Sequence, residues 1–336
     1  MRIGIAALLL ALLPPTVGAD PVAAARYSDH RGGRALLIWQ DGRIIHESYR
    51  AGGGPGRREN LFSITKSVTT LGLFAALGPA SLDTPAARFL PEWKDLSGKS
   101  SLTIRQLLNQ TSGLAPGYQP LYEAGLADKP AAALRLPLLT PPGRTFAYGP
   151  ANSEVLEVVL TRKLNGNPLP WLEKTLPGLD GTPAPFWRRD RRGHPYFSAG
   201  LHLSARELLT VGHLVRRRGW HGLRRVFPGS LMKQAEVGSD ANAMYGLGFW
   251  LNRNAARPGL VERDIEEALA AGLSRRDWAR SGLSQLAPVD LVVMAGSGGQ
   301  RVYVSHAQNL VIVRLGRSGG FRDPDFLRAF YSDPKP

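Results

Sequence analysis

The sequence predicts an α/β fold of the α+β type with two lobes, one built from strands and helices and the other from helices alone. Strand-like runs lie near both ends of the 336-residue chain, and helical patterns fill its middle. We therefore expect an α/β lobe from residues about 20–80 and 235–336, and a helical lobe from about 81–234. Together they would form a single domain spanning 20–336, a length that permits a sizeable core.

The first 19 residues have the pattern of a secretory signal peptide. A basic Met1-Arg2 start is followed by the apolar run 3–13 and by small residues up to Ala19. We expect cleavage after about Ala19 and a secreted or periplasmic protein. The apolar run is short for a bilayer span, and an uncleaved membrane anchor is the alternative.

Composition excludes several classes of protein. The chain has no cysteine, which excludes disulfides, thiolate metal sites and a cysteine nucleophile. The formal net charge is +15, with basic clusters at 188–192, 216–218 and 224–225. We predict no nucleic-acid partner, because no aromatic stacking pattern accompanies the arginines and the chain reads as exported. A solvated face is the simplest interpretation, and attraction to an anionic envelope polymer or membrane surface is the alternative.

The elements follow from local patterns along the chain. Two β-rich runs, 34–40 and 43–49, flank Asp41-Gly42 and predict a hairpin. Ser204 followed by Glu207 predicts a capping box that opens a helix over 204–218. The other expected helices cover 22–30, 102–108, 153–164, 262–280 and 323–331, and the other expected strands cover 245–251, 301–304 and 310–315.

The chemistry of the chain centres on Ser63 and Lys66, which form a Ser-x-x-Lys motif at the start of an apolar helical pattern. On a helix this spacing places both side chains on one face, about one turn apart. A serine hydroxyl needs a base to take its proton, and a lysine with a lowered pKa can be that base. The helix N-terminus would also favour the negative charge that develops on the substrate.

The sequence resembles the serine hydrolases built on the class C β-lactamase and penicillin-binding-protein fold. Five segments resemble that family in the expected order, and the resemblance covers about residues 34–331. These segments are 61–67, 102–114, 198–208, 245–251 and 296–300. The resemblance implies an antiparallel sheet flanked by helices, next to an all-helical lobe.

The resemblance also implies roles for individual residues. Tyr148 would face Ser63 and Lys66 and pass a proton to the leaving group, its anion stabilised by a neighbouring cation. The N–H of Gln300, with that of Ser63, would form the oxyanion hole. Gly298 and Gly299 would let the substrate approach the strand closely, because they have no side chains.

Two departures from the family pattern affect the expected substrate. Tyr148-Gly149-Pro150 replaces Tyr-x-Asn, and Asn152 lies two residues beyond the expected position. Ser297 stands where the third motif often has Lys or His, which helps to bind a substrate carboxylate. Both differences favour the branch that resembles esterases and nylon-oligomer hydrolases.

We therefore expect a serine hydrolase that cleaves a small ester or amide, peptide-like substrates included, through a Ser63 acyl-enzyme and without a cofactor. One alternative is D-alanyl-D-alanine carboxypeptidase or β-lactamase activity. Another is an inactive scaffold that binds cell-wall polymer through its basic surface.

Two other kinds of site find no support in the sequence. The Gly-x-Ser-x-Gly pattern at 316–320 has no histidine after it, as an α/β-hydrolase requires. None of the seven histidines forms a metal-binding pair such as His-Glu-x-x-His, so we expect no metal.

Overall fold

The computed structural model describes residues 19–50, 52–123 and 125–332. The predicted signal peptide, apart from Ala19, lies outside the described residues. The α-helices are α1 (Pro21–His30), α2 (Ile64–Leu77), α3 (Ile104–Leu108), α4 (Tyr118–Tyr122), α5 (Lys129–Arg135), α6 (Ala151–Leu164), α7 (Leu169–Thr175), α8 (Ala205–Arg216), α9 (Gly229–Ala235), α10 (Ile265–Ala270), α11 (Arg275–Arg280) and α12 (Asp323–Tyr331). The strands are β1 (Gly33–Gln40), β2 (Arg43–Tyr49), β3 (Glu59–Asn60), β4 (Phe186–Trp187), β5 (Leu201–Leu203), β6 (Trp220–His221), β7 (Arg224–Arg225), β8 (Trp250–Leu251), β9 (Val261–Glu262), β10 (Ser281–Gly282), β11 (Val292–Gly296), β12 (Gln300–Ser305) and β13 (Leu310–Gly316). None of the helices in the described residues has the length and apolar character needed to cross a membrane.

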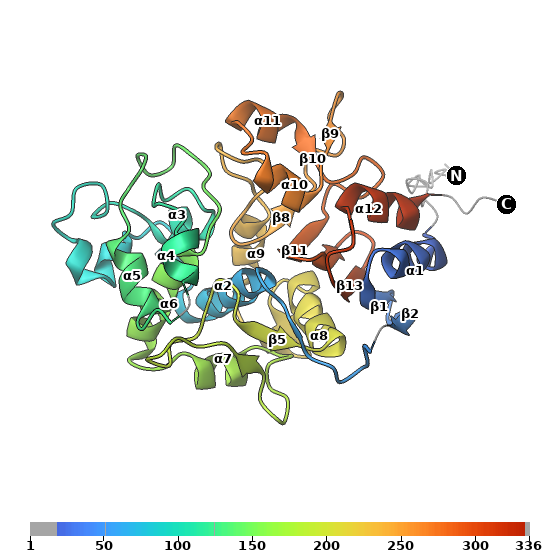
Figure 1. Ribbon diagram of the computed structural model, residues 1–336, viewed down its shortest axis with the longest axis horizontal. Helices are drawn as coiled ribbons and strands as arrows, with labels where there is room; N and C mark the ends of the chain where they lie inside the picture. Colours follow the sequence, from blue (N-terminus) through green and yellow to red (C-terminus); the bar gives the residue numbers. More distant parts are fainter. Residues whose placement is uncertain (1–18, 51, 124, 333–336) are drawn as a thin grey trace, which may run out of the picture.

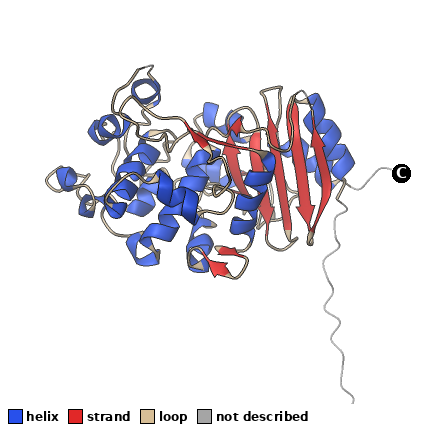
Figure 2. Cartoon of the chain, turned by 90° about the horizontal axis from the view of Figure 1, so that it is seen from below, coloured by secondary structure: helices blue, strands red, loops and turns tan. Residues whose placement is uncertain are grey.

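The main sheet is antiparallel and joins the two ends of the chain. Its six strands follow the order β2-β1-β13-β12-β11-β8, so that β1 pairs with β13 although about 270 residues separate them in sequence. The predicted hairpin is confirmed as β1 and β2, which pair around Asp41 (φ 47°) and Gly42 (φ 93°). These positive φ angles are the ones that a two-residue turn between twisted strands requires. The α+β prediction is confirmed, and Figure 2 shows the strands side by side with helices on both sides.

Both faces of the sheet are buried, and alternate residues of β1 serve the two faces. Ala35 and Leu37 pack into the same core as α2 and α8, whereas Leu36 and Ile38 pack into the core beneath α1 and α12. Successive strand residues point to opposite faces, so a strand covered on both sides reads as an unbroken apolar run. This explains why the sequence of β1 lacks polar alternation.

The helix α8 lies within the range predicted for the helical lobe but packs on the sheet, against β13, β12 and β1. Its capping box is confirmed: Ser204 accepts from the Glu207 N–H, and the Glu207 carboxylate accepts from the Ser204 N–H. At Gly212, an added Cβ would lie 2.6 Å from a methyl group of Val311, so only glycine permits this close approach. The remaining helical layer, α3 to α7, lies beside α2 on the left of Figure 1.

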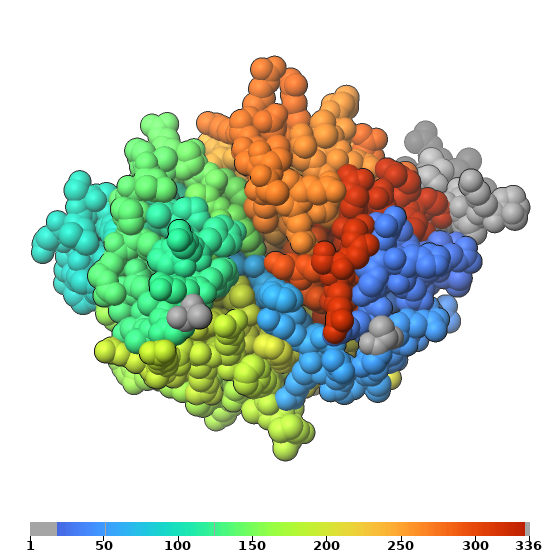
Figure 3. All heavy atoms as spheres, viewed as in Figure 1, coloured from blue at the N-terminus to red at the C-terminus, as the bar shows by residue number. Residues whose placement is uncertain are grey.

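A small sheet holds together the segments that flank the predicted nucleophile. Its order is β3-β5-β4, and the Leu61 N–H donates to the Leu201 carbonyl just after β3 (3.0 Å). The chain that leads into α2 is thereby fixed beside residues 198–201. In Figure 3 this blue segment meets the orange and red C-terminal residues near the centre of the molecule.

Two predicted elements differ from the structure, and one strand of the main sheet was not predicted. Of the predicted strand 245–251 only β8 forms, because Gly248 turns with φ 79° against Thr70 of α2. The predicted helix 262–280 is two short helices, α10 and α11, separated by Gly272 at φ 59°. Strand β11, which the sequence analysis did not identify, pairs with β12 and with β8.

Candidate active site

Ser63 and Lys66 are brought together at the start of α2. Ser63 is the residue that precedes the helix, and the Lys66 Nζ lies 2.9 Å from the Ser63 Oγ. Phe62, immediately before, has φ 46°, a left-handed conformation that non-glycine residues rarely adopt. Strained backbone of this kind is concentrated at functional sites, and here it lies directly before Ser63.

Lys66 is buried, and its environment favours the neutral amine. Its side chain is enclosed by protein, and its Nζ donates to the Ser198 carbonyl (2.8 Å) as well as contacting Ser63. Burial lowers the pKa of Lys66 to about 7, with Glu154 raising it and Lys129 lowering it further. A neutral amine next to a hydroxyl can accept the proton of that hydroxyl, as a general base must.

Tyr148 lies next to this pair in a cluster of aromatic rings. The Lys66 Nζ is 5.0 Å from the centre of the Tyr148 ring, which also packs against Tyr245 and Trp250. Burial raises the pKa of the Tyr148 phenol, and its hydrogen bond with Ser63 acts in the opposite direction. The phenol is therefore neutral near pH 7. The direction of the shift differs from the expectation that a neighbouring cation stabilises the phenolate, because burial has the larger effect on the pKa. A neutral phenol next to Ser63 can donate a proton.

The turn between β11 and β12 approaches the start of α2 at Gly296 and Ser297. An added Cβ on Gly296 would lie 2.1 Å from the Leu61 carbonyl oxygen, so the strand and the turn before Ser63 are in direct contact. Gly296 and Ser297 both line the cavity at Ser63. Within the described part of the chain, the main-chain N–H groups of Ser63 and Ser297 donate to no other protein group. Two free donors on one cavity wall are what an oxyanion hole requires.

The other residues predicted for this motif lie elsewhere. Gln300 is buried in β12, where its side-chain amide exchanges two hydrogen bonds with the main chain of Gly316. Gly298 and Gly299 form the turn with φ near 75° and 72°, and their N–H groups face the Glu266 carboxylate (3.4 and 3.1 Å). Gln300, which the sequence analysis named as an oxyanion donor, does not line the cavity at Ser63, whereas Ser297 does. The sequence analysis did not identify β11, the strand that approaches the start of α2.

Asn152, predicted to bind substrate, is buried in the first turn of α6 and does not line the cavity. Its Nδ2 donates to the Gln110 side chain (3.0 Å). Gln110 in turn accepts from the main chain of Gly149 (3.2 Å), which follows Tyr148 directly. Asn152 and Gln110 therefore position the backbone that carries Tyr148.

A buried charged pair behind Lys66 was not identified from the sequence. The Glu154 Oε1 accepts from the Ser198 N–H (3.0 Å), and the Ser198 carbonyl accepts from Lys66. The Lys129 Nζ lies 3.9 Å from the same Glu154 oxygen, and both side chains are enclosed. A glutamate among the apolar residues of α6 is the sequence signal that could have pointed to this pair.

The cavity at Ser63 has a volume of about 280 Å³ and mixes aromatic rings with a few charges. Its aromatic residues are Phe62, Tyr118, Tyr122, Tyr148, Tyr196 and Trp250. Its charged residues are Arg188, Glu266 and Arg301. Arg301 pairs with Asp323 (2.8 Å), whereas Arg188 forms no ion pair within the described residues and packs over the Tyr196 ring (5.3 Å). Arg188 is thus the available cation on the cavity wall.

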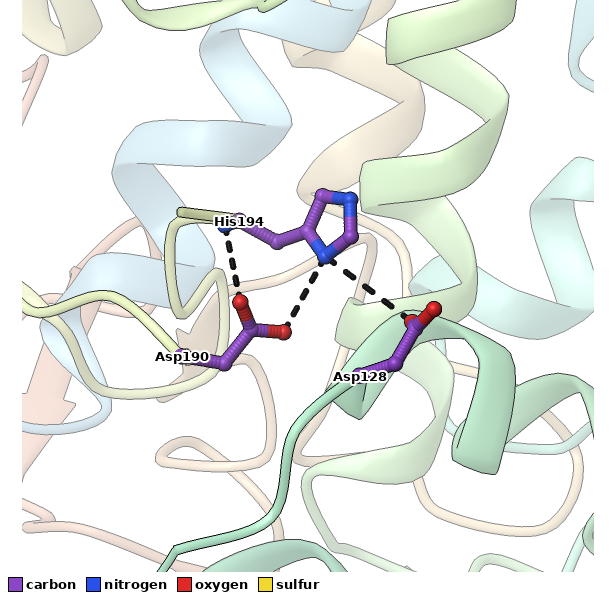
Figure 4. A group of neighbouring side chains, drawn as sticks. All are labelled: Asp128, Asp190 and His194. Atoms are coloured by element: carbon purple, nitrogen blue, oxygen red, sulfur yellow. Dashed lines mark hydrogen bonds and ion pairs between the residues drawn. The ribbon is translucent and has the colours of Figure 1, made fainter. Parts of the chain in front are cut away.

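Asp128, Asp190 and His194 come together near the start of α5, with ligand-type atoms within 4.8 Å of one another (Figure 4). The oxygens of Asp190 already accept from the main-chain N–H groups of Lys129 and Arg192 and from His194, and Asp128 caps α5. Because these oxygens already accept hydrogen bonds, we interpret the three residues as a structural contact that holds α5 against residues 190–194, and not as a metal site.

The fold and the arrangement at α2 define a class of protein, the serine hydrolases that carry a Ser-x-x-Lys pair on this α+β scaffold. The family model described as Beta-lactamase matches residues 20–330, and the chain therefore belongs to the β-lactamase family. This confirms the resemblance seen in the sequence. No curated protein matches the sequence.

Several solved structures share the fold at low identity. A protein from Bacteroides dorei DSM 17855 described as a β-lactamase is 16% identical, with a TM-score of 0.68 over 94% of this chain and 96% of the other. A protein from Bacillus anthracis described as a 6-aminohexanoate-dimer hydrolase is 15% identical, with a TM-score of 0.64 over 91% of this chain and 78% of the other. EstCE1, described as a hydrolase with promiscuous acyltransferase activity, is 17% identical, with a TM-score of 0.63 over 92% of this chain and 99% of the other.

Proposed function

We propose that this protein is a serine hydrolase that cleaves an ester or amide bond through an acyl-enzyme on Ser63. The observation that carries the proposal is the buried Lys66 amine, 2.9 Å from the Ser63 hydroxyl, with a pKa lowered to about 7. This lowering makes the neutral amine far more abundant near pH 7 than it is for an ordinary lysine, whose pKa is 10.5.

The proposed reaction has two halves. Ser63 Oγ attacks the carbonyl carbon as its proton passes to the Lys66 Nζ, and the N–H groups of Ser63 and Ser297 stabilise the resulting oxyanion. Collapse of this intermediate breaks the bond to the leaving group, which takes a proton from the Tyr148 phenol. Lys66 returns a proton to Tyr148. Water then attacks the acyl-enzyme with the same groups acting in reverse, and the acid is released.

Four observations support the esterase or amidase branch over penicillin or D-alanyl-D-alanine recognition. No lysine or histidine is among the described residues that line the cavity, and Asn152 holds the backbone near Tyr148 instead of lining the cavity. Aromatic side chains are the most numerous kind on the cavity wall. Among the similar structures are one described as a 6-aminohexanoate-dimer hydrolase and the hydrolase EstCE1.

Arg188 supports a narrower substrate class, an ester or amide that carries a carboxylate. Its guanidinium is the cavity cation without an ion-pair partner in the described chain, and a planar guanidinium matches a carboxylate through two hydrogen bonds. We expect a p-nitrophenyl ester of glutaric acid to be cleaved faster than the neutral butyrate ester. Arg188→Gln should lower the ratio of the two cleavage rates about tenfold or more. Arg189→Gln changes the exposed next residue and should leave this ratio unchanged.

The test of the central proposal is covalent labelling with a fluorophosphonate, followed by intact-mass spectrometry and peptide mapping. Wild-type protein should gain one adduct on Ser63, and Ser63→Ala should gain none. A stable or hydrolysed penicillin adduct would move the assignment towards the β-lactamase and carboxypeptidase branch. Absence of any label on folded wild-type protein would overturn the proposal in favour of a binding scaffold.

Export is a separate proposal that rests on the N-terminal pattern alone. The mature protein isolated from its host should begin at Asp20 if cleavage follows Ala19. A purified protein that retains Met1 and resides in the cytoplasm would contradict it.

A further inference from the structure

A second cavity lies at the end of α8, away from Ser63, and nothing in the proposed reaction uses it. Its volume is about 270 Å³, and none of its lining residues lines the Ser63 cavity. We call it the Trp220 pocket. It is lined by the residues Trp39, Thr210, His213, Arg216, Arg217, Trp220, His221 and Gly222.

The Trp220 pocket gathers basic groups without acidic ones. Two arginines and two histidines line it, and no lining residue is an aspartate or glutamate. Arg216 donates to the Asn309 side chain, and Arg217 donates to the Gly222 carbonyl (3.0 Å). Neither arginine forms an ion pair within the described residues, whereas the next one, Arg218, pairs with Glu236 (3.2 Å). The two arginines of the pocket therefore hold positive charge that the protein itself does not neutralise.

Two buried donor or acceptor atoms in the pocket have no protein partner. They are the Arg216 Nε and the His213 Nδ1. Burial and the nearby Arg217 lower the pKa of Arg216, and burial together with the neighbouring arginines lowers the pKa of His213 to about 4. Positive charges held close together, as those of Arg216 and Arg217 are, lower the stability of the folded protein, and so do buried polar atoms without partners. A bound anion would offset this loss of stability.

The pocket also presents aromatic surface next to these charges. Trp39 contacts the Arg216 guanidinium (4.4 Å) and the His213 ring (4.5 Å), which hold it in place. Trp220 is 37% exposed and stands at the edge of the β6–β7 hairpin. The cavity volume of about 270 Å³ leaves room for a ligand larger than a single oxyanion.

We propose that the Trp220 pocket binds a sugar ring that carries a phosphate or carboxylate group. The oxyanion would accept from Arg217 and Arg216, and the sugar ring would pack on Trp220, whose indole is also approached by the Arg225 guanidinium (4.8 Å to the ring centre). This assigns a specific site to part of the basic surface of the protein, whose formal net charge is +15. The site would allow the hydrolase to bind an anionic saccharide polymer.

The experiment is calorimetric titration of the full chain with five probes: glucose 6-phosphate, glucuronic acid, glucose, inorganic phosphate and adenosine monophosphate. We expect one site for the two anionic sugars, at least tenfold weaker binding of inorganic phosphate and no measurable binding of glucose. Comparison of the two anionic sugars shows which oxyanion is preferred. Equal binding of glucose, or no binding of either anionic sugar, would overturn the proposal. Tenfold tighter binding of adenosine monophosphate would replace the sugar by a nucleotide.

Variants separate the site from the general positive charge. Arg217→Gln should weaken binding of the preferred anionic sugar about tenfold or more, and Trp220→Ala should weaken the sugar but not inorganic phosphate. Arg26→Gln removes the same charge from an exposed position on α1, and it should change the affinity less than twofold. An equal loss in Arg26→Gln would show diffuse attraction and overturn the site. Each variant must retain the circular-dichroism spectrum of wild type. The Ser63→Ala variant should bind as wild type, so the outcome does not depend on the proposed hydrolase activity.

Discussion

Replacing Lys66 by methionine should abolish activity and at the same time stabilise the protein near neutral pH. Methionine keeps much of the volume of the lysine chain but carries no charge and cannot accept the Ser63 proton. The structure holds Lys66 buried with a pKa of about 7, compared with 10.5 for the free group. A residue that is buried for its chemistry is expected to cost stability.

The expected size of the effect follows from the two pKa values. Because the folded-state pKa is lowered, the unfolded chain binds more protons than the folded one between pH 7 and 10.5, and stability rises with pH across that window. The lowering of the pKa from 10.5 to about 7 makes the full penalty about 5 kcal/mol, on the order of 1.4 kcal/mol for each tenfold change in proton affinity. The penalty is about 4 kcal/mol at about pH 7.5 and about 1 kcal/mol at about pH 9.5. Loss of the Lys66 hydrogen bond to the Ser198 carbonyl opposes the gain by about 1–3 kcal/mol at every pH.

The assay is urea unfolding of wild type and Lys66→Met at pH 7.5 and 9.5, followed by circular dichroism. The stability advantage of the variant should fall by about 2–3 kcal/mol between the two pH values, whatever the cost of the lost hydrogen bond. Other titrating groups are common to both proteins and cancel in the difference. An advantage that does not change with pH would show that the pKa of Lys66 is not lowered, and the proposal that Lys66 is the base would then fail.

Three further changes test other parts of the site. Glu154→Gln removes a charge that raises the pKa of Lys66, so the rise of kcat/KM with pH should move to lower pH; an unshifted profile would argue against coupling through Ser198. Gly296→Ala places a Cβ 2.1 Å from the Leu61 carbonyl and should slow fluorophosphonate labelling at least 100-fold, whereas Gly54→Ala, at an open position, should label at the wild-type rate. Asp323→Asn removes the carboxylate nearest to the enclosed Arg301 guanidinium (2.8 Å) and leaves those of Glu266 and Asp264 at 3.4 and 3.7 Å. It should lower the free energy of unfolding by about 3–5 kcal/mol, and a loss below about 1 kcal/mol in urea titrations would contradict the importance of this pairing.

The sequence by itself determined the α+β class, the β1–β2 hairpin and the pairing of Ser63 with Lys66. Each of these depends on residues close together in the chain. The Asp41-Gly42 turn fixes the hairpin, and a spacing of three residues at a helix start places the lysine next to the serine. The order of family segments extended this local reading to the whole fold.

Only the tertiary structure decided which groups from distant segments meet at that pair. Strand β11 was not recognised, so the donor that faces Ser63 was assigned to Gln300 although Ser297 lines the cavity. Ser198 and Glu154 reach Lys66 through the β3-β5-β4 sheet and through α6, contacts that no local pattern encodes. The pKa values of Lys66 and Tyr148 depend on burial, which the packing of the whole chain sets: burial lowers the pKa of the lysine and raises that of the phenol.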